Sequence, residues 1–177
     1  MRKKGIVVIA ILSLIVISMV GCKSKTADTN IIKTDKPTIK IEDASGKKGD
    51  NVKVKIITNK VSGKNTVCCD FKIKYDPNNF EVSKVVPGSI LKDPKDNFDY
   101  TIDGKNGIVS FLYSYTDKNL GKELISTDGE FATINIKVKN EAKKGKSQIS
   151  FNDKTEFYDK GQKPITVASE NGEIDIK

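Results

Sequence analysis

Residues 67–77, which read VCCDFKIKYDP, decide the fold class. From Val67 to Tyr75 an apolar residue or cysteine occupies every second position, and Asp76-Pro77 then supplies a turn. Because successive side chains of a β-strand point to opposite faces, this alternation predicts a strand with one buried and one solvated face. The inward row is expected to be Cys69, Phe71, Ile73 and Tyr75, with Cys68, Asp70 and Lys72 facing outward.

The same period of two recurs from Thr38 to the end of the sequence. It is clearest in residues 52–56, 109–113, 132–138 and 174–176, and pairs such as Pro87-Gly88 and Asp128-Gly129 separate the runs as turns. No stretch of ten or more residues keeps a helical period, and residues 93–97 (DPKDN) are expected to form a loop. The pattern predicts an all-β domain, an antiparallel β-sandwich of jelly-roll-like type.

The N-terminus has the pattern of a targeting segment. Three basic residues precede the uncharged run Gly5–Val20, which as a helix spans roughly 24 Å and is short for a membrane span of ~30 Å. Such a run is typical of a secretory signal peptide. The following Met19-Val20-Gly21-Cys22 resembles the bacterial lipobox, with Met19 where Leu is usual. Cys22 is therefore the predicted lipidation site, and two acyl chains suffice for stable anchoring.

These features divide the chain into three parts. Residues 1–21 are predicted to be a lipoprotein signal peptide, residues 22–37 the lipidated cysteine with a polar, flexible linker, and residues 38–177 the β-sandwich domain. The expected location is the extracellular face of the cell membrane.

Composition excludes several function classes. The sequence has no His, which removes imidazole-based catalysis and the commonest metal ligand. Without Arg2, Lys3 and Lys4 the formal charge falls from +8 to +5, and the lysines are dispersed rather than gathered with aromatics, so nucleic-acid binding is not expected. Cys68 and Cys69 are adjacent on a strand and point to opposite faces, which disfavours a disulfide between them. No metal or other cofactor is predicted.

Several motifs in order resemble the type I cohesin domain. The segment 69–77 (CDFKIKYDP) is followed by 80–82 (FEV), 86–88 (VPG), 107–113 (GIVSFLY), 125–132 (ISTDGEFA) and 171–174 (NGEI). Each motif alone is common in turns and strands. Together, in this order, they are specific, and the resemblance extends over residues 38–177. The resemblance implies a non-catalytic domain that binds a dockerin, the module through which polysaccharide-degrading enzymes such as glycoside hydrolases join a cellulosome-like complex. Calcium is expected on the dockerin and not on this chain.

The resemblance also implies which residues contact the dockerin. On the predicted strand from Val67 to Tyr75, Cys68 occupies the position at which the family has a dockerin-binding Asn, and a thiol is only a weak hydrogen-bonding group. The family's dockerin-binding Asp is kept as Asp70. An outward Leu112 on a polar sheet face has the character of a small hydrophobic hot spot. The full expected set is Cys68, Asp70, Asp99, Asp103, Leu112, Ser114, Tyr115, Asn119, Gln162 and Lys163.

Two other functions remain open at the level of sequence. A carbohydrate-binding lipoprotein on the same sandwich is the main alternative, although the absence of Trp counts against a sugar platform. A hydrolase is a weaker alternative, because aspartates are plentiful but nothing groups a pair of them in a cleft.

Overall fold

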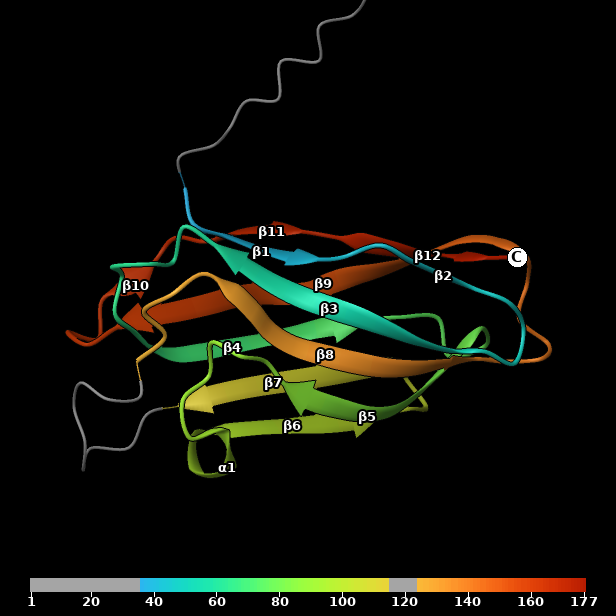
Figure 1. Cartoon of the computed structure of the whole chain (residues 1–177), viewed down its shortest axis with the longest axis horizontal. Coiled ribbons are helices and arrows are strands. Elements are labelled where there is room, and N and C mark those ends of the chain that lie inside the picture. The colour runs from blue at the N-terminus through green and yellow to red at the C-terminus, as the bar shows by residue number, and fades with distance from the viewer. Residues whose placement is uncertain (1–35, 115–123) are drawn as a thin grey trace, which may run out of the picture. The chain divides into compact units, whose positions relative to one another are not determined.

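The computed structural model describes residues 36–114 and 124–177. Within this part of the chain the structure is a set of β-strands with a single-turn helix (Figure 1). The strands are β1 (Thr38–Ile41), β2 (Ala44–Gly46), β3 (Asn51–Asn59), β4 (Thr66–Lys74), β5 (Phe80–Pro87), β6 (Phe98–Asp103), β7 (Ile108–Ser114), β8 (Gly129–Val138), β9 (Gly145–Asp159), β10 (Pro164–Ile165), β11 (Ala168–Glu170) and β12 (Gly172–Ile176), and the helix is α1 (Pro94–Asn97).

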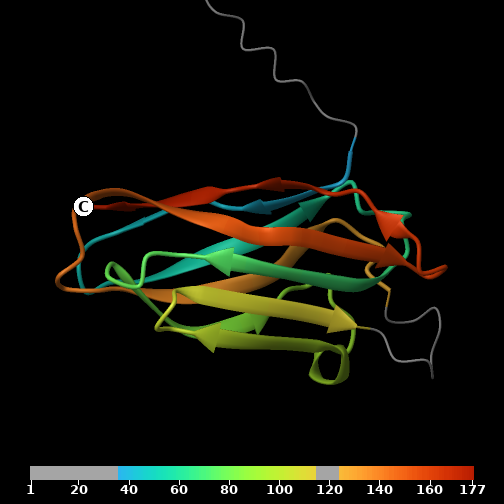
Figure 2. The ribbon, with the colours of Figure 1, turned by 180° about the vertical axis from the view of Figure 1, so that it is seen from behind.

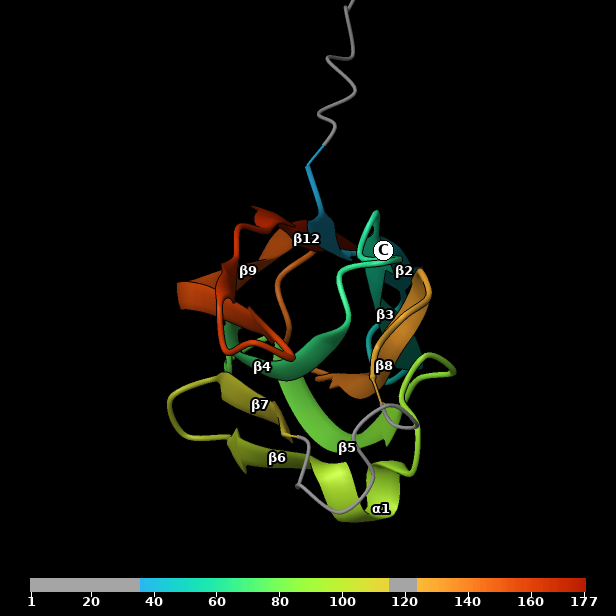
Figure 3. The same ribbon diagram turned by 90° about the vertical axis from the view of Figure 1, so that its left-hand side faces the viewer.

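The strands form two sheets packed face to face. One sheet has the order β11-β1-β3-β8-β5, and the other has the order β2-β12-β9-β4-β7-β6 with β10 added beside β9. The end-on view shows the two layers, with β3, β8 and β5 opposite β4, β7 and β6 (Figure 3). This arrangement confirms the predicted all-β sandwich.

Two features of the sheets differ from the prediction. The pairs β1–β11 and β2–β12 are parallel, so the sandwich is not antiparallel throughout. Both parallel pairs join segments from opposite ends of the domain, a proximity that local turn signals do not encode. Residues 94–97 form the one-turn helix α1, although residues 93–97 were expected to be a loop; Pro94 at its first turn favours helical φ.

The core consists of the inward rows that the alternation predicts. Cys69, Phe71 and Ile73 of β4 and Tyr75 directly after it are buried, as are Val109, Phe111 and Tyr113 of β7. The alternation of buried and exposed residues does not hold at the start of β4. Val67 is half-buried and Thr66 takes the buried position, because the pairing of β4 with β9 shifts register between Thr66 and Cys68.

At two turns, glycine allows a close approach between backbone segments. A Cβ on Gly88 would lie 1.9 Å from the carbonyl oxygen of Glu130, and one on Gly107 would lie 2.2 Å from that of Tyr75. Gly107 also has a φ of +67°, which favours glycine. The Asp76 carboxylate accepts hydrogen bonds from the Asn78 backbone N–H (2.9 Å) and the Asn79 side chain (3.0 Å), and so closes the turn after β4.

Candidate functional site

The candidate site is the outer side of four adjacent strands, β9, β4, β7 and β6, which we call the four-strand face. It is the side turned toward the viewer in Figure 2. Its members follow from register, because residues directly opposite one another on paired strands point to the same side of the sheet. The predicted residues Asp70, Leu112 and Asp99 are such partners on β4, β7 and β6, so the structure brings them into one row.

This central row combines one apolar side chain with three carboxylates. Across the face it runs Glu156, Asp70, Leu112, Asp99, one residue from each strand. With strands about 4.8 Å apart, the row is roughly 14 Å long. Leu112 is 43% exposed, unusually high for a leucine at the centre of a sheet. A partner that covered Leu112 would also meet the three carboxylates.

Shallow hollows lie on both sides of Leu112. The first has a volume of about 270 Å³, and its lining includes Lys72, Ser110 and Thr101. The second has a volume of about 330 Å³, and its lining includes Asn97 of α1 and Ser114 of β7. Leu112 and Asp99 line both hollows, so Leu112 stands between two depressions into which side chains of a partner can fit.

Cys68 lies at one end of the face. It is half-buried, opposite Tyr158 of β9 and Ser114 of β7. Burial, followed by the negative charges of Asp70 and Glu156, raises the pKa of the Cys68 thiol. Cys69 is fully buried, and burial raises its pKa further. At neutral pH Cys68 therefore presents a neutral thiol to this part of the face.

We expect this environment to slow alkylation of Cys68. In the domain Thr34–Lys177, one thiol should react with iodoacetamide at pH 8 about tenfold more slowly than free cysteine, because the raised pKa leaves less thiolate. The rate should still be rising above pH 9, and Cys69 should react only on unfolding. Asp70→Asn should accelerate the reaction and Asp99→Asn should not, as followed by mass spectrometry. A rate that levels off below pH 8 would contradict this account.

Asp103 is on the same face as Asp99 but has a local role. Its two carboxylate oxygens accept hydrogen bonds from the Asn106 backbone N–H (3.1 Å) and the Asn106 side-chain amide (2.6 Å). These two bonds lower the pKa of Asp103. Asp103 therefore closes the turn between β6 and β7, four residues and roughly 13 Å along the strand from Asp99.

Gln162 and Lys163 are exposed in the turn between β9 and β10. The Asp159 side chain accepts hydrogen bonds from the backbone N–H groups of Gly161 (2.7 Å) and Lys163 (3.0 Å), and the latter bond is the main cause of the lowered pKa of Asp159. This turn follows the end of β9 that pairs with Cys68, so both predicted residues lie near that end of the face. The predicted Tyr115, Asn119 and Cys22 lie outside the described residues.

The sequence interpretation missed two residues of the face, Glu156 and Tyr158. Glu156 is directly opposite Asp70, and Tyr158 is directly opposite Cys68. The Glu156 carboxylate accepts a hydrogen bond from the Tyr158 hydroxyl (3.3 Å) and forms an ion pair with Lys154 (3.0 Å), which lowers the Glu156 pKa. The alternation of Glu156, Phe157 and Tyr158 could have placed Glu156 and Tyr158 on the outer face. Three residues before Glu156, however, Asp153 has a φ of +67° and interrupts the alternation along β9.

Comparisons with known proteins identify close relatives of this domain. The cohesin domain family matches residues 37–176. The cellulosomal-scaffolding protein A of Acetivibrio thermocellus is 35% identical over 150 residues, which are 77% of this chain and 8% of that protein. The cellulosome-anchoring protein of the same organism is 32% identical over 150 residues, 85% of this chain and 32% of that protein. This chain thus spans less than a third of either relative's length.

Solved cohesin structures are similar to this chain in fold. The cohesin in a type I cohesin–dockerin complex from Clostridium thermocellum has a TM-score of 0.76 and 31% identity, over 80% of this chain and 99% of that one. A cohesin from Clostridium acetobutylicum, solved in solution, has a TM-score of 0.70 and 28% identity, over 82% of this chain and 94% of that one. On the evidence of its sequence and its two-sheet fold, this chain belongs to the cohesin domain family.

Proposed function

We propose that this domain is a non-catalytic receptor that binds the dockerin modules of polysaccharide-degrading enzymes through the four-strand face. The observation that carries the proposal is Leu112, which is exposed at the centre of a polar sheet face and flanked by Asp70 and Asp99. Relatives of similar fold form type I cohesin–dockerin complexes, which supports this choice of partner. The role of the chain is then to position an enzyme that another protein carries.

The second part of the proposal concerns location. We infer that Cys22 is lipidated and holds the domain at the outer face of the cell membrane. The basic N-terminus, the uncharged run Gly5–Val20 and the lipobox-like Met19–Cys22 support this. Among the described residues, no helix is long and apolar enough to cross a bilayer. One relative is named as a cellulosome-anchoring protein, in keeping with a surface location.

The direct test is calorimetry of Thr34–Lys177 with a panel of type I dockerins. We expect tight binding to at least one dockerin in calcium, and loss of binding in EDTA, because the metal stabilises the EF-hand-like loops of the dockerin. Calcium added to this domain alone should give no heat of binding. Heat from that control would contradict the assignment of calcium to the partner.

The carbohydrate-binding alternative is tested in the same experiment. A larger hollow, about 550 Å³, lies along β9 and the β10–β11 segment, with Phe151 and Tyr158 in its lining. It includes Glu156 and Tyr158 from the β9 side of the four-strand face but neither Asp70 nor Leu112 from its centre. Binding to a polysaccharide, with no heat from any dockerin, would overturn the receptor proposal in favour of this alternative.

A further inference from the structure

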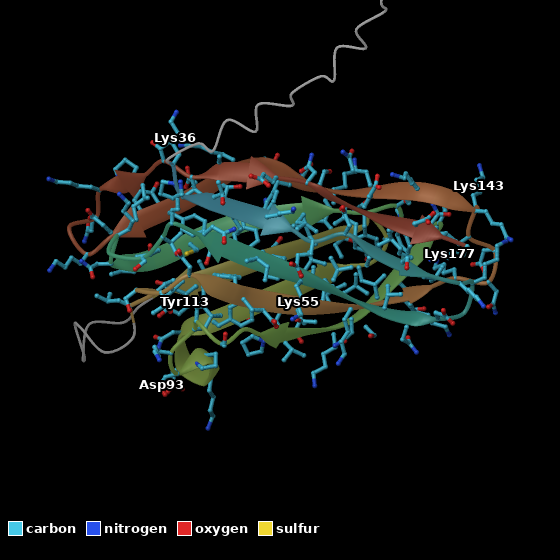
Figure 4. The ribbon with its side chains drawn as sticks, turned by 45° about the horizontal axis from the view of Figure 1, so that its top comes forward. Lys36, Lys55, Asp93, Tyr113, Lys143 and Lys177 are labelled. Atoms are coloured by element: carbon cyan, nitrogen blue, oxygen red, sulfur yellow. The ribbon has the colours of Figure 1, made fainter. Side chains whose placement is uncertain are left out.

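The outer side of the five-stranded sheet carries a group of lysines. Lys53 and Lys55 of β3, Lys137 of β8 and Lys84 of β5 are all exposed. Core residues flank Lys53, Lys55 and Lys137 on both sides, and the core residue Val85 follows Lys84, so the four lysines point away from the core. We call this surface the lysine face. Lys55 is labelled in Figure 4, over the middle of the domain.

Register brings these lysines together. Lys53 and Lys84 are both opposite Asn135 of β8, one from each side, so their Cα atoms are about 10 Å apart. Lys137 lies one pleat further along the same side of β8. Lys55 pairs with Glu130 (3.1 Å), whereas Lys53, Lys84 and Lys137 have no ion-pair partner within 4.0 Å among the described residues. In the described part of the chain, these three lysines therefore form no ion pair, although the charge of Lys53 helps to lower the pKa of Glu130 and Lys137 is directly opposite Glu81.

The basic character continues into the loops at one end of the sheet. The loop before β3 and the loop after β8 meet there, since the Gly49 backbone N–H donates to the Val138 carbonyl (2.8 Å). Figure 4 places Lys143, from the second loop, at this end of the domain. Lysines of the lysine face and these loops are Lys47, Lys48, Lys53, Lys55, Lys84, Lys137, Lys139, Lys143 and Lys144, against the acidic Asp50, Glu81, Glu130 and Glu141.

The two sides of the sandwich therefore differ in charge. Carboxylates occupy the central row of the four-strand face at Glu156, Asp70 and Asp99. Lysines dominate the lysine face. The strands of that face, β3, β8 and β5, form the other layer (Figure 3). An anionic surface near the domain would attract the lysine face and repel the four-strand face.

We propose that the lysine face docks on a bilayer containing anionic lipid headgroups, and so turns the four-strand face away from the membrane. Juxtamembrane lysines are attracted to such bilayers, and a flat sheet face lets several reach the headgroups together. Val86, 37% exposed on the same side of β5, adds apolar contact. A bilayer is the occupant because residues 23–37, if they form a coil after lipidated Cys22, would have a root-mean-square span of about 20 Å.

The tether thus keeps the domain within reach of the headgroups. This distance is shorter than β9 alone, whose 15 residues extend for roughly 50 Å. The inference goes beyond the proposed function and takes from it only the lipid anchor. Binding of the domain to vesicles is measured without the anchor and without a dockerin, so failure of this proposal is distinguishable from failure of the receptor proposal.

Vesicle co-sedimentation tests the docking directly. The domain Thr34–Lys177 contains the whole described core and is suitable for this purpose. We expect at least tenfold stronger binding to vesicles of 70% phosphatidylcholine and 30% phosphatidylglycerol than to pure phosphatidylcholine, at about 50 mM salt. Binding should be lost at about 0.5 M salt, where screening shortens the range of the attraction. Equal binding to both vesicles, or binding to neither, would overturn the proposal.

Matched charge reversals locate the surface. The variant Lys53→Glu/Lys84→Glu should reduce binding to the anionic vesicles about tenfold and leave dockerin affinity unchanged. The variant Lys72→Glu/Lys74→Glu makes the same charge change on the outward side of β4 and should reduce vesicle binding less than threefold. Both variants should keep the wild-type urea midpoint. An equal loss in the two variants would show attraction by net charge alone and would overturn the assignment to the lysine face.

Discussion

The double variant Asp70→Ala/Leu112→Ala is expected to lose at least a hundredfold in affinity for a cognate dockerin. The two residues are directly opposite one another on β4 and β7, at the centre of the four-strand face. A central side chain that becomes fully desolvated can contribute 2 kcal/mol or more, about thirtyfold in affinity, whereas rim contacts contribute little. Calorimetry with calcium present, against the dockerin that binds the wild-type domain, measures the loss.

The structure offers a matched control in Val86→Ala. Val86 and Leu112 are the two exposed large hydrophobic residues of the described chain, at 37% and 43%, but they lie on different sheets. Val86→Ala should change dockerin affinity less than twofold, because it removes a similar apolar surface outside the four-strand face. If Val86→Ala weakened binding as much as the double variant, the dockerin would not be bound by the four-strand face.

The orientation of each strand was predictable from sequence because it depends on local alternation. Cys69 and Phe71 were expected inside and Asp70 outside, and Leu112 was expected on the outer side of its strand; all four expectations are confirmed. Period two fixes the side of the sheet on which a residue lies once one face is buried. The outward side chains of β4 and β7 could therefore be identified without coordinates, whereas their role as dockerin contacts was implied only by the family resemblance.

Strand partners were not predictable in the same way. Glu156 lies opposite Asp70, but 86 positions separate them in sequence, and two register shifts occur where β4 pairs with β9. One shift accompanies the half-buried position of Val67, and Asp153, with its positive φ, interrupts β9. A bulge adds one residue to a strand, so every later side chain lies on the opposite face from the one that the alternation predicts. One such irregularity is enough to make the alternation misleading for the rest of the strand.

Local hydrogen bonds change what some predicted contact residues can offer. Asp103 has both carboxylate oxygens bonded to Asn106, so a partner would have to compete with the turn for them. Among the described residues Asp99 accepts one such bond, at its Oδ1 from the Tyr100 backbone N–H (2.8 Å), and keeps its other oxygen for a partner. The sequence shows two outward aspartates on one strand, and only the structure distinguishes them. Asp99 is the better candidate for a dockerin contact.

The site depends on an aromatic cluster directly beneath it. Phe71, next to Asp70 in β4, is almost fully buried and stacks on Phe111 of β7, with ring centroids 4.8 Å apart. It also contacts Phe131 of β8 in the other sheet (5.3 Å) and Phe151 of β9 (5.7 Å). One ring thus contacts both layers and both neighbours of β4. Removing it would leave a cavity that the surrounding strands can fill only in part.

Phe71→Ala is accordingly expected to lower the free energy of unfolding by about 3–5 kcal/mol, a large share of the 5–15 kcal/mol typical of a domain. Phe98→Ala removes the same side chain from the edge strand β6, where Phe98 is only half-buried, and should cost less than half as much. Urea unfolding of Thr34–Lys177 measures both, with an unchanged m-value showing that two-state behaviour is kept. Equal losses in the two variants would mean that the core is not centred on Phe71.

Because Asp70 and Leu112 are retained, the folded fraction of Phe71→Ala should still bind dockerin. This result would separate the stability of the sheet from the chemistry of its outer face.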